Sequence, residues 1–144
     1  MRYTLTFFWI ILAFASISFW EAYIEGEHGG AEKQVGWVRK IFGLRLTGYH
    51  FMLFGVCLPL FLLLPIITHG YDGKLLAVIA CGYLVGILVE DFLWFVVNPK
   101  FKFKDFRHEK VWWYPWMRVG SYHIPILYPV AIALSGVIWY LFIR

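Results

Sequence analysis

The sequence predicts an all-α integral membrane protein, a bundle of four transmembrane helices that alternate in direction. Apolar residues make up 61% of the 144 residues and charged residues only 15%, and long uncharged runs recur along the chain. These runs are near or above the roughly 20 residues that a helix needs to cross a bilayer. We expect helices at about 4–25, 48–68, 74–97 and 122–143, all within one transmembrane domain that covers residues 1–144.

The basic residues divide unevenly between the two ends of this bundle. Because the helices alternate, both termini and the turn at 68–74 belong to one end, and the linkers 26–47 and 98–121 belong to the other. Ten of the thirteen lysines and arginines fall in the two linkers. Cytoplasmic loops of membrane proteins carry such an excess of basic residues. We therefore expect a protein of the cell membrane with cytoplasmic linkers and both termini outside.

Both linkers mix basic and apolar residues. Residues 34–46 alternate the two kinds, which predicts a short amphipathic helix lying in the membrane interface. Residues 100–118 interleave phenylalanines with lysines and then carry several tryptophans, aromatic residues that favour the headgroup level. We call the segments 34–46 and 100–118 the cationic collar. It either braces the bundle or gathers an anionic lipid or substrate.

Acids and histidines gather toward the linker end, and several of them lie inside or next to the expected helices. Each helix contributes: Glu21, Glu25 and His28 from the first, His50 from the second, Glu90 and Asp91 from the third, and His123 from the fourth. The three residues of the first helix share one face if that helix continues through Gly26. Since the helices alternate, we expect all these side chains at one level of the membrane.

The third helix indicates which of its two acids faces the bundle. Gly82, Gly86 and Glu90 are spaced by four, and stripes of small residues mark close helix contacts in membranes. Glu90 is therefore expected to point into the bundle. Asp91 lies about 100° further around the helix. We expect it nearer the interface, where an arginine or lysine of the collar pairs with it.

A carboxylate in lipid costs several kcal/mol unless it is protonated, paired or bound to a metal. Histidines and carboxylates from several helices of a bundle are typical of a first-row metal site. The spacing Glu25-x-x-His28 occurs in di-iron bundles, but such proteins use two of these motifs and here only one is present. The sequence therefore predicts a mononuclear or an atypical dinuclear site that holds iron or zinc.

The predicted ligands are drawn from all four helices: His50, Glu90 and His123, completed by Glu25 or His28. Glu21 and Asp91 are the predicted catalytic residues, which would orient ligands or move protons. Each residue also has a structural interpretation. Histidines at helix starts often reach the headgroups, and Glu21, Glu25 and His28 could form a solvated helix end.

Three classes of function remain. The first is a metal-dependent membrane enzyme, an oxidoreductase or a hydrolase, acting on a lipid or another apolar or anionic small molecule. The second is a proton- or cation-coupled transporter or channel, although few polar residues lie in the far half of the bundle. The third is a non-catalytic lipid- or haem-binding subunit, with haem a weaker cofactor candidate than iron or zinc. The expected partners are membrane lipids and either further copies of the chain or a larger membrane complex, but no nucleic acid.

Overall fold

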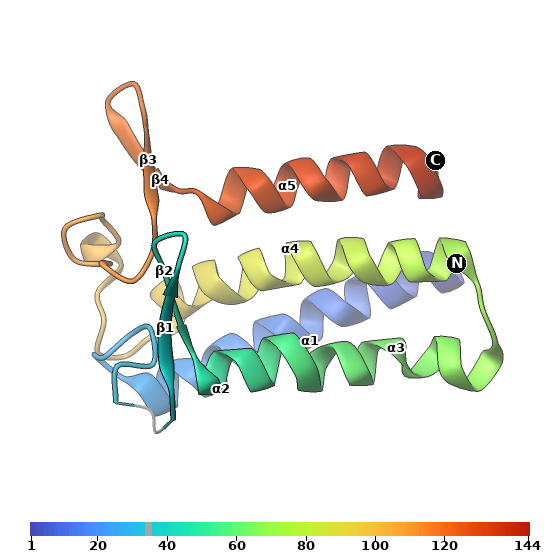
Figure 1. Ribbon diagram of the computed structural model, residues 1–144, viewed down its shortest axis with the longest axis horizontal. Coiled ribbons are helices and arrows are strands. Elements are labelled where there is room, and N and C mark those ends of the chain that lie inside the picture. Colours follow the sequence, from blue (N-terminus) through green and yellow to red (C-terminus); the bar gives the residue numbers. More distant parts are fainter. Residues whose placement is uncertain (34–35) are drawn as a thin grey trace.

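The computed structural model describes residues 1–33 and 36–144. Four helical rods lie side by side, with both chain termini at one end and two β-hairpins at the other (Figure 1). The rods are α1 (Arg2–Glu25), a second rod formed by α2 (Gly48–His50), η1 (Phe51–Cys57) and α3 (Leu58–His69), then α4 (Gly73–Val97), and finally α5 (Leu127–Ile138) continued by η3 (Trp139–Ile143). A single short turn, η2 (Phe103–Asp105), lies in the second linker.

The mostly helical architecture agrees with the sequence prediction. Three helices, Arg2–Glu25, Gly48–His69 and Gly73–Val97, are long and apolar enough to cross a membrane. The fourth, Leu127–Ile143, is apolar but shorter. Its expected start at residue 122 is wrong, because residues 122–125 pair as a strand before the helix begins. The insertion of all four helices in a bilayer stays a prediction.

The amphipathic helix expected at 34–46 is a hairpin in the structure. Strand β1 (Val38–Ile41) pairs antiparallel with β2 (Leu44–Thr47), while residues 34–35 of the expected helix lie outside the described residues. In β2, Leu44, Arg45 and Leu46 alternate apolar and basic residues with the period of a strand. Between the strands, Phe42 and Gly43 both have positive φ, the two-residue turn that matches strand twist. A second hairpin, β3 (Trp116–Val119) with β4 (Tyr122–Pro125), closes the other linker.

The close packing of α1 against α4 organises the bundle. Gly86 leaves so little space that an added Cβ would lie 2.4 Å from the Phe14 ring, and one at Gly82 would lie 3.0 Å from Ile10. Both Ile10 and Phe14 are buried. The glycine stripe therefore marks a close helix contact, as expected, and it brings the polar ends of α1 and α4 together.

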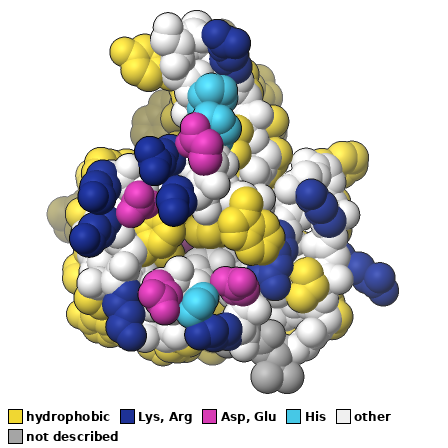
Figure 2. All heavy atoms as spheres, turned by 90° about the vertical axis from the view of Figure 1, so that its left-hand side faces the viewer, with side chains coloured by type: hydrophobic (Ala, Val, Ile, Leu, Met, Phe, Trp, Pro, Cys, Tyr) yellow, Lys and Arg dark blue, Asp and Glu magenta, His cyan; other side chains and the backbone are white. Residues whose placement is uncertain are grey.

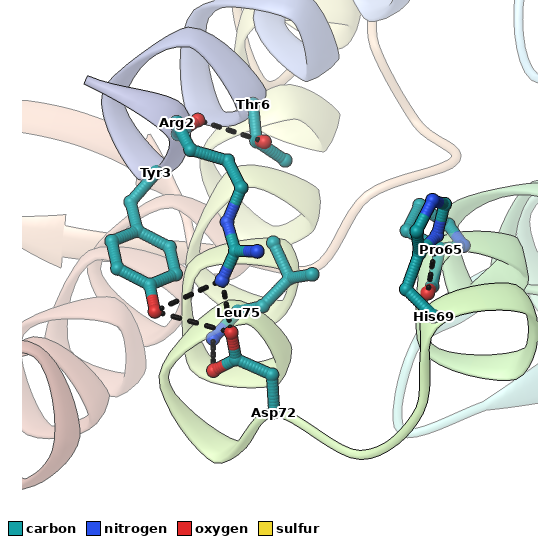
Figure 3. Close-up of polar contacts among 7 residues, drawn as sticks. All are labelled: Arg2, Tyr3, Thr6, Pro65, His69, Asp72 and Leu75. Atoms are coloured by element: carbon teal, nitrogen blue, oxygen red, sulfur yellow. Dashed lines mark hydrogen bonds and ion pairs between the residues drawn. The ribbon is translucent and has the colours of Figure 1, made fainter.

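A polar cluster joins the helices at the opposite end (Figure 3). The Arg2 guanidinium donates to the Asp72 carboxylate, and the Tyr3 hydroxyl donates to the same carboxylate at 3.1 Å. Asp72 also caps α4 by accepting a hydrogen bond from the Leu75 amide at 2.9 Å. These contacts hold the pKa of Asp72 below its usual value, chiefly through the Leu75 amide and further through Tyr3 and Arg2.

The glycine contact can be tested by adding one methyl group. We predict that Gly86→Ala lowers the free energy of unfolding of the purified protein by about 1–3 kcal/mol, because the added methyl group overpacks against the Phe14 ring. Gly136→Ala in α5 is the matched control, since no atom lies within 4 Å of its added Cβ. An equal effect of the two substitutions on thermal unfolding in detergent would contradict this packing.

The Asp72 cluster gives a prediction for pH. Asp72→Asn keeps a helix-capping side chain and removes the charge. Since the pKa of Asp72 is lowered in the folded protein, its charge stabilises the fold above the unfolded pKa, and this contribution is lost as pH falls through the folded value. We expect the variant to unfold at a lower temperature at neutral pH and the difference to vanish in acid. A difference that is constant with pH would refute this role.

Candidate functional site

A pocket of about 280 Å³ lies at the hairpin end of the bundle. Its walls come from α1, β2, α2, η1, α4, the first residue of α5 and the segment before β3. Most of its lining is apolar, but four acids also line it: Glu21, Glu25, Glu90 and Asp91. All four are buried, with exposed fractions of 3%, 8%, 6% and 8%. We call this the carboxylate pocket.

Two of these acids face each other across the α1–α4 contact. Glu21 on α1 and Glu90 on α4 are neighbours in the carboxylate pocket, and both carboxyl groups are buried. Glu21 Oε1 is buried and makes no hydrogen bond among the described residues, and neither does the hydroxyl of Tyr49, the donor that lies beside Glu21. Two adjacent carboxylates away from water repel each other, so this pair needs a shared proton or a cation.

Glu25 lies one helical turn further along α1 and faces His50. Its Oε1 accepts a hydrogen bond of 2.6 Å from the Ala31 amide and lies 3.9 Å from His50 Nε2. The other ring nitrogen of His50, Nδ1, lies 3.0 Å from Thr47 Oγ1. Thr47 also accepts from the His50 amide and so caps α2. Thr47 therefore fixes the ring with Nε2 directed toward Glu25.

Asp91 is held by two tyrosines. The hydroxyl of Tyr114 donates to Oδ1, and that of Tyr128 donates to Oδ2 at 2.5 Å. Burial, and next the charge of Asp91, raise the pKa of Tyr114 well above its usual value, so its hydroxyl stays protonated and donates. The expected pairing of Asp91 with a basic residue of the cationic collar is therefore wrong.

Two of the predicted ligands do not reach the pocket. Helix α1 ends at Glu25, and Gly26 turns the chain with φ of 59°, so the helix expected to continue through Gly26 does not form. His28 lies beyond this turn, with Nδ1 3.1 Å from Glu32 Oε2. His123 lies on β4 and not at a helix start; it is exposed, and its ring stacks on His108 with centroids 3.9 Å apart. Neither His28 nor His123 lines the carboxylate pocket.

Sequence reasoning missed several residues of the pocket. Arg45 and Tyr114 line the pocket. From the composition of the two linkers, both residues were expected in the cationic collar. The residues next to them in the sequence are also basic or aromatic, and no local pattern distinguishes Arg45 and Tyr114 from these neighbours. Part of the wall, including Phe54 and Gly55, belongs to the π-helix η1. Short π-helical segments are frequent at functional sites.

Comparison with protein families, with curated proteins and with solved structures finds no match for this chain. Within residues 1–33 and 36–144, no three His, Cys, Asp or Glu side chains stand as a ready set of metal ligands. The carboxylate pocket combines an apolar lining with convergent polar groups, which is the usual form of a ligand site.

The tyrosine contacts to Asp91 give a stability test. Tyr114→Phe and Tyr128→Phe each leave a buried carboxylate oxygen without its donor, and we expect each to cost about 1–3 kcal/mol of unfolding free energy. Tyr122→Phe, at an exposed position on β4, is the matched control and should have little effect. Thermal unfolding of all three variants in one detergent checks this. Equal stability of the three would show that Asp91 does not depend on these hydroxyls.

Proposed function

We propose that the chain is an integral membrane enzyme that binds a divalent metal ion, iron or zinc, in the carboxylate pocket and acts on a lipid or other apolar molecule. One observation carries the proposal. Glu21, Glu25, Glu90 and His50 line a single buried pocket, and Glu21 Oε1 has no partner there among the described residues. A cation would balance this excess of buried negative charge.

The spacing of Glu25 and His50 supports a metal. At 3.9 Å, Glu25 Oε1 and His50 Nε2 are too far apart for a hydrogen bond. Two ligand atoms that are each about 2.0–2.2 Å from one ion can lie up to about 4 Å apart. The hydroxyl of Thr47 at Nδ1 is the kind of second contact that orients a ligand histidine. Glu21 and Glu90 would complete the site by rotating toward His50.

The rest of the pocket supplies the other parts of an enzyme site. A bound metal would provide Lewis-acid or redox chemistry. Phe51, Phe54 and Ile87 form an apolar wall for the substrate. The Tyr114 hydroxyl and the Asp91 carboxylate also line the pocket and form a hydrogen-bonded pair next to Glu90, which can hold or pass a proton.

The far half of the bundle favours an enzyme over a transporter. There the buried residues of the described core are mainly apolar, with Ile10, Phe14, Leu75 and Ile79 in one cluster. A proton or cation path across a membrane needs polar groups along its length. In the described part of the chain, the buried carboxylates are confined to the hairpin end.

The charge distribution supports an orientation with the hairpins in the cytoplasm. Figure 2 looks at this end and shows many Lys and Arg side chains around it, with Asp and Glu between them. Basic residues near the ends of membrane helices favour the cytoplasmic side. The carboxylate pocket would then lie just inside the cytoplasmic face of the membrane.

Metal analysis tests the proposal. We expect the purified protein to hold roughly one iron or zinc ion per chain, and Glu21→Gln, Glu90→Gln and His50→Gln to lose it, because each removes a ligand. Glu27→Gln is the matched control, since Glu27 is exposed and lies just beyond α1. Elemental analysis before and after chelation gives the content, and circular dichroism checks the fold. A wild type without metal, or three variants that retain it, would contradict the proposal.

A further inference from the structure

One arginine lies inside the carboxylate pocket. Arg45 on β2 is half-buried and is the only Lys or Arg among the described residues that line the pocket. Its backbone amide donates to the Trp113 carbonyl at 3.1 Å, its guanidinium donates to the Gly30 carbonyl, and the group lies 5.5 Å from the centre of the Trp112 ring. These three contacts fix the position of its charge.

Arg45 retains donors for a ligand. A guanidinium carries five N–H groups in a planar fork that suits carboxylate and phosphate. In the described part of the chain, its side chain makes one hydrogen bond, to Gly30. Among the described residues Arg45 forms no salt bridge, although four acids line the same pocket. The remaining donors are therefore available to an anionic group.

The apolar wall of the pocket lies between two rods. Phe51 and Phe54 come from η1, while Leu127 begins α5. The two rods each lie alongside α4 (Figure 1). No residue of η1 or α3 is buried, so the second rod has a large apolar surface in contact with its surroundings. In a bilayer these surroundings are acyl chains, which can reach the pocket from the side.

We propose that the carboxylate pocket takes an amphiphile with an anionic head group, whose carboxylate or phosphate is bound by Arg45 and whose alkyl chain lies along Phe51, Phe54 and Leu127. This inference rests on the proposed function for the identity of the site, in which a metal ion, or protons on the same carboxyl groups, would neutralise the acids that otherwise repel an anion. It narrows the substrate from any apolar molecule to one with a charged head.

Binding of single-chain amphiphiles tests this inference. The full-length protein in a non-ionic detergent is titrated with dodecanoate and dodecyl phosphate, with dodecanol and dodecyltrimethylammonium as neutral and cationic probes, and native mass spectrometry reports the bound fraction. We expect the anionic probes to bind and the other two to bind at least about tenfold more weakly, the ratio of one charge-assisted contact. Tighter binding of dodecanoate would indicate a carboxylate head group, and tighter binding of dodecyl phosphate would indicate a phosphate head group.

Two variants assign the binding to Arg45. Arg45→Gln should weaken the anionic probes about tenfold. Lys40→Gln is the matched control, because Lys40 pairs directly across the hairpin from Arg45 and is exposed. An equal effect of both variants, no binding of the anionic probes, or tighter binding of the cationic probe would overturn the inference.

Metal content of the same samples separates this inference from the proposed function. Arg45 is not among the proposed ligands, so Arg45→Gln should keep its metal while losing the amphiphile. A wild type that binds the anionic probes through Arg45 but holds no metal refutes the metal proposal and leaves the head-group assignment standing. A wild type that holds metal but binds no anionic probe refutes only the head-group assignment.

Discussion

The approach of α1 to α4 is the constraint on which the rest of the structure depends. Gly86 and Gly82 bring the backbone of α4 close enough for Phe14 and Ile10 to lie against it. Because the two helices are this close, the side chains on their facing sides must also come close together further along the helices. Here these are the side chains of Glu21 on α1 and Glu90 on α4. The apolar contact in the middle of the bundle thus fixes the distance between two carboxyl groups at its end.

That distance has a chemical consequence. Buried groups with the same charge are tolerated only where a proton, a cation or a dense set of donors compensates them. Asp91 has its donors in Tyr114 and Tyr128, and Glu25 has the Ala31 amide. Glu21 Oε1 has none among the described residues. Both oxygens of Asp91 are therefore hydrogen-bonded while Glu21 Oε1 is not, and this difference is the basis of the proposal that Glu21 and Glu90 bind a cation.

Sequence patterns predict the parts of this protein that depend on local periodicity. Hydropathy gives the helices, and the glycine stripe gives the inward direction of Glu90, which is buried. Patterns fail where partners are distant. Tyr114 and Tyr128 lie 23 and 37 residues from Asp91, and nothing near Asp91 indicates them. The hairpin in the first linker was missed because alternating basic and apolar residues suit an interfacial helix as well as a strand. His123 was predicted at the start of the last helix because the apolar run begins at about residue 122. In the structure the first residues of this run form β4.

Infrared spectroscopy of the protein's carboxyl groups tests the central claim most directly, because it distinguishes a protonated carboxyl from a carboxylate. We expect a protonated-carboxyl band in protein stripped of metal. The band should weaken when iron or zinc is added, and it should be weaker in the metal-free double variant Glu21→Gln, Glu90→Gln than in the metal-free wild type. A spectrum that the metal leaves unchanged, or a band of equal strength in the wild type and the double variant, would contradict this claim, because the shared proton or metal would then not lie on the Glu21–Glu90 pair.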